Sequence, residues 1–447
     1  MSARLAIAVA LGLCACGDNR QVDDLFEAVS GSRLKLEWHL YPDGTRQAET
    51  TAFYDLDVHA RCTPQRWIDD VIRCVPIADD AIYIDATCEN LVGRARTIEK
   101  PTHFIGYDTL AGTTLPARLY RAGPTTTPVS QRYEVRDGMC VGPFSTPSDL
   151  TYYQLVDEIA GADLLAVRDA EVGAGRLALA YRATDDGLRL PTGLRDRDLD
   201  LSCTPMAGAD GGFRCAPTEA ATPSYFRDPA CEQAVITVAD GAAAPTIATL
   251  ADPSGCARYH AVGGEVTGPL YRRDSAACTR VTPTPPPRQF PVGAELELPI
   301  LDRTIEDASA RRLQRIILGD DQLRFVDDRL YDTATGAECV RRASGDVMRC
   351  LPAVVANATM LRTPSCTGEV LVAEIPQHTC ERIGFATAFG RQQVTIHAVG
   401  ARAADTLYQL TGAGCQPYPG APGHELRTLS PAIAPETFPA AVRYGER

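Results

Sequence analysis

Short apolar-rich runs, some of which alternate with polar residues, recur along the whole chain. Examples are RLKLEWHL (33–40), AIYID (81–85), VTIHAV (394–399) and DTLYQL (405–410), which are rich in β-branched or aromatic residues and bounded by turn formers. A two-residue period between turn residues is typical of β-strands with one buried face. Helical periodicity is scarce, and its best candidate is 162–172. The pattern therefore predicts an all-β protein.

The strand pattern carries a motif that occurs three times, Arg-Cys-apolar-Pro at 73–76, 214–217 and 349–352. Three further landmarks recur at matching distances: an Arg-Leu opening (Arg33, Arg176, Arg312), a turn aspartate (Asp43, Asp186, Asp321), and an aspartate seven residues before the first cysteine (Asp55, Asp196, Asp332). Self-similarity of this kind indicates repeated structural units. We divide the chain into repeat 1 (33–175), repeat 2 (176–311) and repeat 3 (312–447), each about 140 residues long with about eight strands.

Three such units suggest a closed arrangement of about twenty-four strands. We predict a six-bladed β-propeller with two blades per repeat, because closure protects the edges of the strands. The alternative is a row of three small β-domains, each stapled by disulfides. The proline-rich segment 281–291 would then act as a stiff linker.

The sixteen cysteines of the chain indicate the kind of compartment in which the protein resides. They form no Cys-x-x-Cys pair of the kind that zinc sites use, and their wide spacing is typical of disulfides made in an oxidising compartment. Facing strands of a hairpin predict three short disulfides, Cys62–Cys74, Cys203–Cys215 and Cys339–Cys350. In repeat 1 this leaves Cys88 to pair with Cys140.

The remaining six cysteines allow two pairing schemes. One scheme joins Cys231 to Cys278, Cys366 to Cys415 and Cys256 to Cys380. The other joins Cys231 to Cys256, Cys366 to Cys380 and Cys278 to Cys415. Both schemes use all six, so the sequence does not choose between them.

The arginine of each repeated motif is predicted to form an ion pair. Side chains alternate along a strand, so this arginine faces away from its cysteine, and so does the aspartate seven residues before the other cysteine. The expected pairs are Asp55–Arg73, Asp196–Arg214 and Asp332–Arg349.

The first residues have the order of a secretion signal. Arg4 is followed by an apolar run over 5–13, which is too short to span a bilayer. LCAC (13–16) resembles a bacterial lipobox, and this resemblance implies cleavage of a 1–15 signal peptide and lipid on Cys16. Cys14 fits less well, because a leucine would precede the cut.

With lipid on Cys16, residues 16–32 would form the lipidated cysteine and its tether. Gly17 follows Cys16, and the enteric sorting rule then predicts an anchor in the outer membrane. The protein would lie in the cell envelope, on the periplasmic or the cell-surface face. Its only contact with the lipid membrane would be this anchor.

Charge and motifs narrow the chemistry. The net charge of −13 argues against nucleic-acid binding. The sequence has no Gly-x-Ser-x-Gly, no His-Glu-x-x-His and no phosphate-binding glycine loop. None of the seven histidines recurs at equivalent positions of the repeats. We therefore predict no catalytic residue, no cofactor and no metal ligand.

The combination of Tyr-Asp, Cys, RCLP and a closing LY…C motif behind a lipobox resembles uncharacterised cysteine-rich repeat lipoproteins of myxobacteria and their relatives. These are domains of unknown function, so the resemblance implies no activity or substrate. The first repeat departs from the others because it lacks a cysteine that matches Cys256 and Cys380.

Together these features predict a monomeric, surface-anchored lipoprotein that acts as a non-enzymatic binding or scaffold module. Its ligand would be a glycan or a protein. The alternative is a secreted β-propeller hydrolase whose acid and base carboxylates sit on separate loops, since paired carboxylates need no sequence motif.

Overall fold

The computed structural model of the chain describes residues 26–96, 100–110, 112–136, 138–147, 149–251, 256–274, 277–307, 310–377, 380–389, 394–404, 406–412, 414–421 and 423–445. The all-β prediction is confirmed. The helical elements described are two single turns of 3-10 helix, η2 (Gly161–Asp163) and η3 (Pro435–Thr437). The candidate helix at 162–172 overlaps η2 and ends in the strand β12 (Arg168–Val172).

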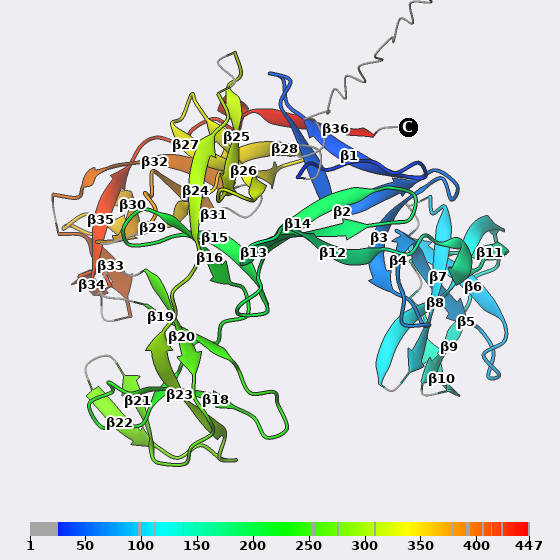
Figure 1. Cartoon of the computed structure of the whole chain (residues 1–447), viewed down its shortest axis with the longest axis horizontal. Coiled ribbons are helices and arrows are strands. Elements are labelled where there is room, and N and C mark those ends of the chain that lie inside the picture. The colour runs from blue at the N-terminus through cyan, green and yellow to red at the C-terminus, as the bar shows by residue number, and fades with distance from the viewer. Residues whose placement is uncertain are drawn as a thin grey trace, which may run out of the picture.

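One sheet of fifteen strands, called the ring sheet below, contains the first four strands of every repeat (Figure 1). Repeat 1 contributes β1 (Leu34–Leu40), β2 (Arg46–Asp55), β3 (Ala60–Arg66) and β4 (Ile72–Pro76). Repeat 2 contributes β13 (Leu177–Ala183), β14 (Arg189–Asp196), β15 (Leu201–Ala207) and β16 (Phe213–Pro217). Repeat 3 contributes β25 (Leu313–Gly319), β26 (Arg324–Asp332), β27 (Ala337–Ser344) and β28 (Val347–Pro352).

Three link strands join these groups: β12 (Arg168–Val172), β24 (Ile300–Ile305) and β36 (Ala440–Gly445). The residues that lead into each link strand lie along the last strand of their own repeat. The N–H groups of Cys74, Cys215 and Cys350 donate to the carbonyls of Leu165, Pro299 and Pro439 at 2.9, 3.0 and 3.0 Å. The link strand then pairs with the first strand of the next group, and β36 returns to β1. The ring sheet therefore closes on itself.

The rest of each repeat forms a seven-stranded sheet outside the ring. These sheets are called barrels 1, 2 and 3 below, after the repeat that forms them. Barrel 1 contains β5 (Asp79–Tyr83), β6 (Leu91–Arg96), β7 (His103–Leu110), β8 (Thr113–Thr125), β9 (Gln131–Arg136), β10 (Met139–Ser145) and β11 (Leu150–Ile159). Barrel 2 contains β17 (Tyr225–Phe226), β18 (Ala234–Val238), β19 (Ile247–Ala251), β20 (Ala257–Val262), β21 (Leu270–Asp274), β22 (Ala277–Val281) and β23 (Arg288–Glu295). Barrel 3 contains β29 (Val355–Arg362), β30 (Glu369–Pro376), β31 (Phe385–Phe389), β32 (Val394–Arg402), β33 (Tyr408–Thr411), β34 (Gly414–Pro417) and β35 (His424–Leu429).

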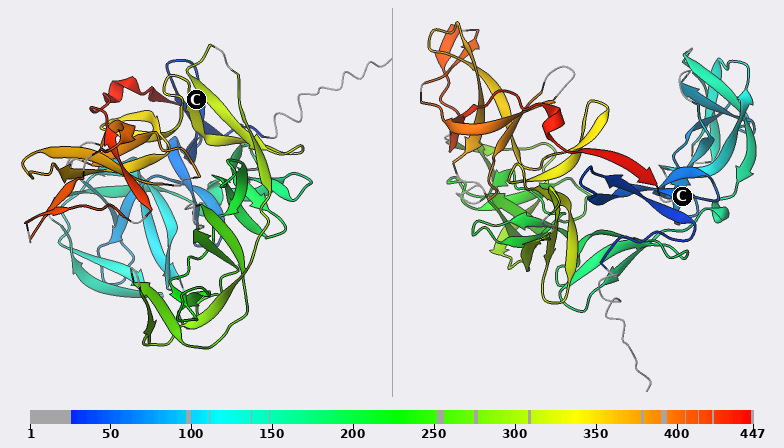
Figure 2. Two further views of the ribbon diagram at one scale, coloured as in Figure 1. Left: turned by 90° about the vertical axis from the view of Figure 1, so that its left-hand side faces the viewer. Right: turned by 90° about the horizontal axis from the view of Figure 1, so that it is seen from above.

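In barrel 1 five strands close in the order β5, β6, β11, β8 and β7, with β5 and β7 parallel. Barrel 3 repeats this circuit. Barrel 1 stands apart from barrels 2 and 3 (Figure 2). One ring sheet with three outlying barrels differs from six four-stranded blades. The link strands explain the difference, because they join the groups edge to edge instead of leaving separate blades.

The groups of the ring sheet are capped by turn aspartates of their neighbours. Asp186 in repeat 2 accepts hydrogen bonds from the N–H groups of Arg33 and Leu34 at 2.8 and 2.7 Å. Asp43 in repeat 1 accepts one from the N–H of Leu313 at 2.7 Å. These carboxylates satisfy donors at the start of a strand and fix how one repeat sits on the next.

The junction between repeats 2 and 3 does not use the turn aspartate that the sequence pattern predicted, Asp321. Gln322, and not Asp321, occupies the corresponding place in repeat 3, and its side-chain oxygen lies beside Gly175. The turn before β26 spans 320–323 and is one residue shorter than the matching turns at 41–45 and 184–188. Gln322 is the residue nine positions after the opening leucine, so its carboxamide takes the position of the carboxylate.

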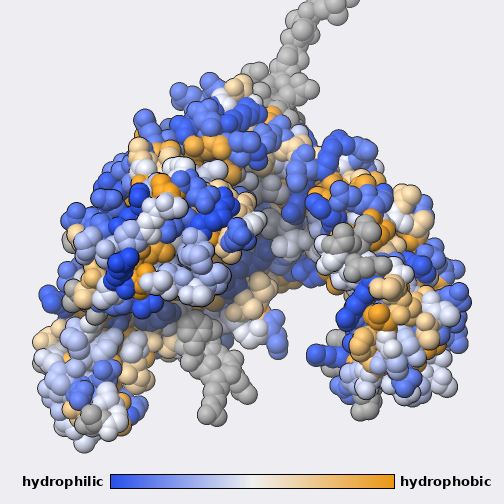
Figure 3. Space-filling model, turned by 90° about the horizontal axis from the view of Figure 1, so that it is seen from below, coloured by the Kyte–Doolittle hydropathy of each residue, from blue (hydrophilic) through white to orange (hydrophobic). Residues whose placement is uncertain are grey.

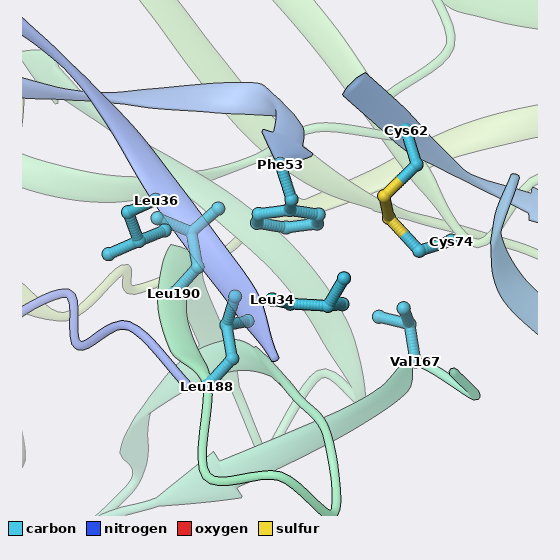
Figure 4. Packing of buried hydrophobic residues seen from close by; sticks show 8 residues of the cluster. All are labelled: Leu34, Leu36, Phe53, Cys62, Cys74, Val167, Leu188 and Leu190. Atoms are coloured by element: carbon cyan, nitrogen blue, oxygen red, sulfur yellow. A yellow bond between two sulfur atoms is a disulfide. The ribbon is translucent and has the colours of Figure 1, made fainter. Parts of the chain in front are cut away.

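Each group of the ring sheet has its own small core around a buried disulfide. In repeat 1 the core contains Leu34, Phe53 and the Cys62–Cys74 bond, and repeat 2 adds Leu188 and Leu190 (Figure 4). The corresponding cores in repeats 2 and 3 contain Cys203–Cys215 and Cys339–Cys350. Since each core draws side chains from two repeats, the ring sheet folds as one body.

The structure contains the first of the two disulfide schemes. Within the barrels, Cys88 is bonded to Cys140, Cys231 to Cys278 and Cys366 to Cys415. Each of these bonds fastens the turn after the first barrel strand to an outlying hairpin. The seventh bond, Cys256–Cys380, crosses from barrel 2 to barrel 3.

Candidate functional site

The three aspartates expected to pair with the motif arginines pair instead with the arginine that opens their own repeat, so that prediction is wrong. Asp55 accepts two bonds of 2.8 Å from Arg33. Arg176–Asp196 and Arg312–Asp332 repeat this geometry at 2.8–3.2 Å. The cause is register, because the start of β1 lies beside the end of β2 and Leu34 is opposite Asp55.

The motif arginines bind other partners: two of them pair with a turn aspartate, and the third binds a backbone carbonyl near the end of its repeat. Arg73 and Arg214 pair with Asp69 and Asp210, four residues before them. Arg349 donates to the carbonyl of Phe438 at 2.9 Å. Their strands lie two places away from the aspartates that the sequence assigned to them. Cys16, the predicted lipidation site, lies outside the described residues.

A groove of about 1150 Å³ lies where the ring sheet meets barrel 3. Its walls come from the β15–β16 turn, β24, the β26–β27 turn and the strands β30 to β32. The space-filling view shows a largely hydrophilic surface (Figure 3). The hollow seen there, between barrel 1 at the right and the rest of the molecule, is separate from this groove. A groove of this size can take an extended ligand, since small-molecule pockets are typically about 300–1,000 Å³.

Phe213 forms part of one wall of the groove, and two arginine side chains pack against its ring. The guanidinium carbons of Arg303 and Arg329 lie 5.8 and 5.6 Å from the centre of its ring. Glu338 binds both arginines, at 2.7 Å to Arg303 and 3.0 Å to Arg329. Cation–π contacts and shared ion pairs hold all four side chains in place, so this wall needs little reordering when a ligand binds.

This groove breaks the threefold repetition of the ring sheet. Phe213 precedes the motif arginine in repeat 2, but Ile72 and Met348 occupy that position in the other repeats. Cys380 of the bond between barrels 2 and 3 also lines the groove. Repeat 1 has no matching cysteine. One of three similar junctions therefore has both an aromatic wall and a covalent tie.

A second, smaller pocket of about 480 Å³ lies where all three repeats meet. It is lined by the first strands of each group, with Trp38 and Arg46 from repeat 1, Arg182 from repeat 2 and Arg315 from repeat 3. Phe26, the first residue described, lies against the same pocket. We call it the central pocket.

A β-bulge in β26 projects into the central pocket. The pairing of β25 with β26 skips between Arg315 and Ile317, which leaves Asp327, Asp328 and Arg329 looped out of register. Bulges commonly re-aim side chains next to functional sites. Arg329 lies 2.6 Å from Asp327 and, through Glu338, also reaches the groove.

The two aspartates of the bulge titrate differently. Burial disfavours the charged form of Asp327, but the hydrogen bond and charge of Arg329 outweigh it and lower its pKa. Loss of water around the carboxyl raises the pKa of Asp328 to about 6, although the residue still reaches solvent, and a hydrogen bond with Asp327 and its negative charge add to the shift. Neighbouring carboxyls with separated pKa values are a common sign of a functional site.

Replacing Asp328 with asparagine should stabilise the protein in a pH-dependent way. Its folded-state pKa exceeds the usual 3.8, so the stability it contributes is present below about pH 4 and is lost as the pH rises through about 6. We expect Asp328→Asn to raise the melting temperature by about 1–3 °C at pH 8 and to leave it unchanged at pH 4. Thermal unfolding at both pH values checks this. The exposed Asp346→Asn is the control, and equal shifts at both pH values would contradict the assignment.

A third polar cluster is closed to solvent. His39 and Glu49, both buried, lie 3.0 Å apart, and Arg341 reaches Glu49 at 3.2 Å. The hydrogen bond from His39 is the main cause of the lowered pKa of Glu49. Because Arg341 belongs to repeat 3, this network fastens repeat 3 to repeat 1 and offers no access to a ligand.

Two further observations restrict the chemistry. In the part of the chain that the structure describes, we find no group of three or more His, Cys, Asp or Glu side chains placed to hold a metal ion. Among the same residues, no helix has the length and apolar character needed to cross a membrane.

Comparison with known proteins adds the family. A family of unknown function, DUF7481, matches residues 9–438. The chain belongs to this family. No curated protein and no solved structure matches the chain. The matched residues include all three barrels and every strand of the ring sheet except β36.

Sequence reasoning missed the groove and the central pocket. Phe213, Arg303 and Glu338 lie in three different strands, and no short motif joins them. The bulge had a signal in the sequence, since VDDRLYD (326–332) places Asp327, Asp328 and Arg329 next to one another and interrupts the alternation of apolar and polar residues.

Proposed function

We propose that this member of DUF7481 is a non-enzymatic binding module of the bacterial cell envelope, and that it holds an extended ligand in the groove beside barrel 3. The observation that carries the proposal is the fixed wall of Phe213, Arg303 and Glu338, which Arg329 holds from the side of the central pocket. It offers an aromatic face together with charged donors and acceptors, a combination that suits sugar rings and their hydroxyl groups. An envelope polysaccharide is therefore the first ligand to test, and a protein segment is the second.

The location rests on the disulfides and on the N-terminal sequence. Seven disulfides indicate an oxidising extracellular or envelope compartment. The lipobox-like LCAC (13–16) supports a lipid anchor on Cys16 in the outer membrane, as in the myxobacterial repeat lipoproteins that the sequence resembles. Mass spectrometry of the mature protein tests the anchor, because acylation adds a defined mass to the peptide that begins at Cys16.

Binding to the groove can be measured by calorimetry with soluble peptidoglycan fragments and with lipopolysaccharide-derived polysaccharide. We expect Phe213→Ala to raise the dissociation constant at least about tenfold, or about 1.4 kcal/mol, because the groove loses the aromatic ring that contacts the ligand. Arg303→Gln should act in the same direction. Met348→Ala truncates the equivalent position of repeat 3 and should leave the affinity unchanged. If all three variants bind like the parent protein, the groove is not the site.

A hydrolase is the second candidate, favoured by the Asp327–Asp328 pair in the central pocket. Glycosidases keep their two carboxyls about 5–10 Å apart, whereas these two share a hydrogen bond. Carboxyls in direct contact share a proton, as in aspartic proteases, so this geometry favours peptide over glycoside hydrolysis. Mass spectrometry of a peptide mixture incubated with the protein tests it. Products that disappear in Asp328→Asn would support the hydrolase, and unchanged peptides would exclude it.

A further inference from the structure

The central pocket is a separate site from the groove, with a different chemistry. Its volume of about 480 Å³ falls in the range of small-molecule pockets. All three repeats contribute to it, so it exists only when the ring sheet is closed. The proposed function in the groove does not depend on it.

The arginines of the central pocket fall into two classes. Arg315 is paired with Glu27 at 2.9 Å, and Arg329 with Asp327 at 2.6 Å. Arg46 and Arg182 differ, because among the described residues neither has a carboxylate within 4.0 Å. Asp328 is the one carboxylate of the lining that has no ion pair among the described residues, so these two guanidinium groups outnumber it. The surplus of positive charge favours a negatively charged ligand.

Arg46 is also held in position. Its guanidinium carbon lies 4.6 Å from the centre of the Trp38 ring, so a cation–π contact restrains an otherwise exposed side chain. The restraint lowers the entropy that Arg46 would lose when it binds an anion. Trp38 thereby links the charged part of the pocket to its apolar part.

The remaining walls are largely apolar. Phe26, Leu190, Pro205 and Phe325 come from the N-terminal segment and from repeats 2 and 3. Such walls gain free energy by covering hydrocarbon and offer little to a hydrated inorganic ion. The ligand therefore needs an apolar body as well as a charge.

We propose that the central pocket binds a small organic anion, a carboxylate or sulfonate on an aromatic or aliphatic body. Arg46 and Arg182 hold the acid group, and Trp38, Phe325 and Pro205 cover the body. The ligand bridges repeats 1, 2 and 3, so its binding also stabilises the closed ring sheet.

Two fluorescent probes that share one ring system test the proposal. 1-Anilinonaphthalene-8-sulfonate carries a sulfonate, and N-phenyl-1-naphthylamine lacks it. We expect the sulfonate to bind the full chain with one-to-one stoichiometry and at least about tenfold more tightly than the neutral probe. Energy transfer from tryptophan to the bound sulfonate should fall in Trp38→Phe, because Trp67, the other tryptophan, is buried in a different cluster.

The double variant Arg46→Gln/Arg182→Gln should weaken the sulfonate at least about tenfold and leave the neutral probe unchanged. Arg46→Gln alone changes one exposed side chain, so it provides the same test if the double variant does not fold. Arg342→Gln removes an exposed arginine of β27 and is the control. Unaltered sulfonate affinity in both variants, equal affinity for the two probes, or binding without energy transfer from Trp38 would each overturn the proposal. Phe213→Ala should leave sulfonate binding intact, which separates this site from the groove.

Discussion

Asp196→Ala is expected to lower the free energy of unfolding by about 3 kcal/mol. The carboxylate is fully buried, accepts bonds from Arg176 at 2.8–3.2 Å and also accepts the N–H of Asp198 at 3.0 Å. Its removal takes from the Arg176 guanidinium its buried carboxylate partner and from a turn N–H its acceptor. The loss lies at the low end of the range for broken buried pairs because 33% of the Arg176 side chain reaches solvent. Denaturant unfolding of both proteins measures it.

Asp198→Ala is the matched control. Asp198 contacts the same arginine at 3.3 Å, but 68% of its side chain is exposed. Exposed ion pairs contribute about 0–1 kcal/mol, so we expect a loss below about 1 kcal/mol. Arg214→Ala should cost equally little, because Arg214 pairs with the exposed Asp210. If Asp196→Ala and Arg214→Ala lowered the free energy of unfolding equally, the result would support the Asp196–Arg214 pair that the sequence predicted.

Removing the bond between barrels 2 and 3 is expected to have the largest effect. Cys256 and Cys380 are 124 residues apart, and chain entropy assigns about 5 kcal/mol to a cross-link of that length. The variant Cys256→Ser/Cys380→Ser should therefore unfold at a lower denaturant concentration. The groove should also bind its ligand more weakly, since Cys380 lines it and the bond holds barrel 3 to barrel 2.

Cys88→Ser/Cys140→Ser is the comparison for the groove. This bond lies within barrel 1 and closes 52 residues, so its loss should destabilise the protein by about 4 kcal/mol without changing ligand affinity in the groove. Unchanged affinity in both double variants would show that the bond between the barrels does not shape the groove. An unchanged unfolding midpoint in Cys256→Ser/Cys380→Ser would contradict the stability estimate.

The repeated landmarks identified the class of fold because each one reports local geometry. Alternation in RLKLEWHL (33–40) reflects the burial of Leu34 and Leu36, and each Arg-Cys-apolar-Pro motif marks the end of a strand. The propeller prediction failed because closure depends on β12, β24 and β36. These strands pair with two different repeats in turn, and such pairings leave no local pattern.

The candidate sites depend on contacts between distant strands, so sequence alone could not find them. Phe213 and Glu338 lie 125 positions apart, and only the closed ring brings them to one wall. The ion pairs failed for a related reason. The sequence showed which residues recur, but the register of β1 against β2 decided that Asp55 meets Arg33 and not Arg73.

The pairing of β36 with β1 has a consequence for synthesis. The partner strand of β1 is the last strand described, so a nascent chain carries an unpaired β1 edge until the ribosome has added residues 440–445. Until then the sheet is an open ribbon. Unpaired edges invite pairing with other chains. Assembly of the ring is therefore a step that each molecule can complete only after residues 440–445 have been synthesised.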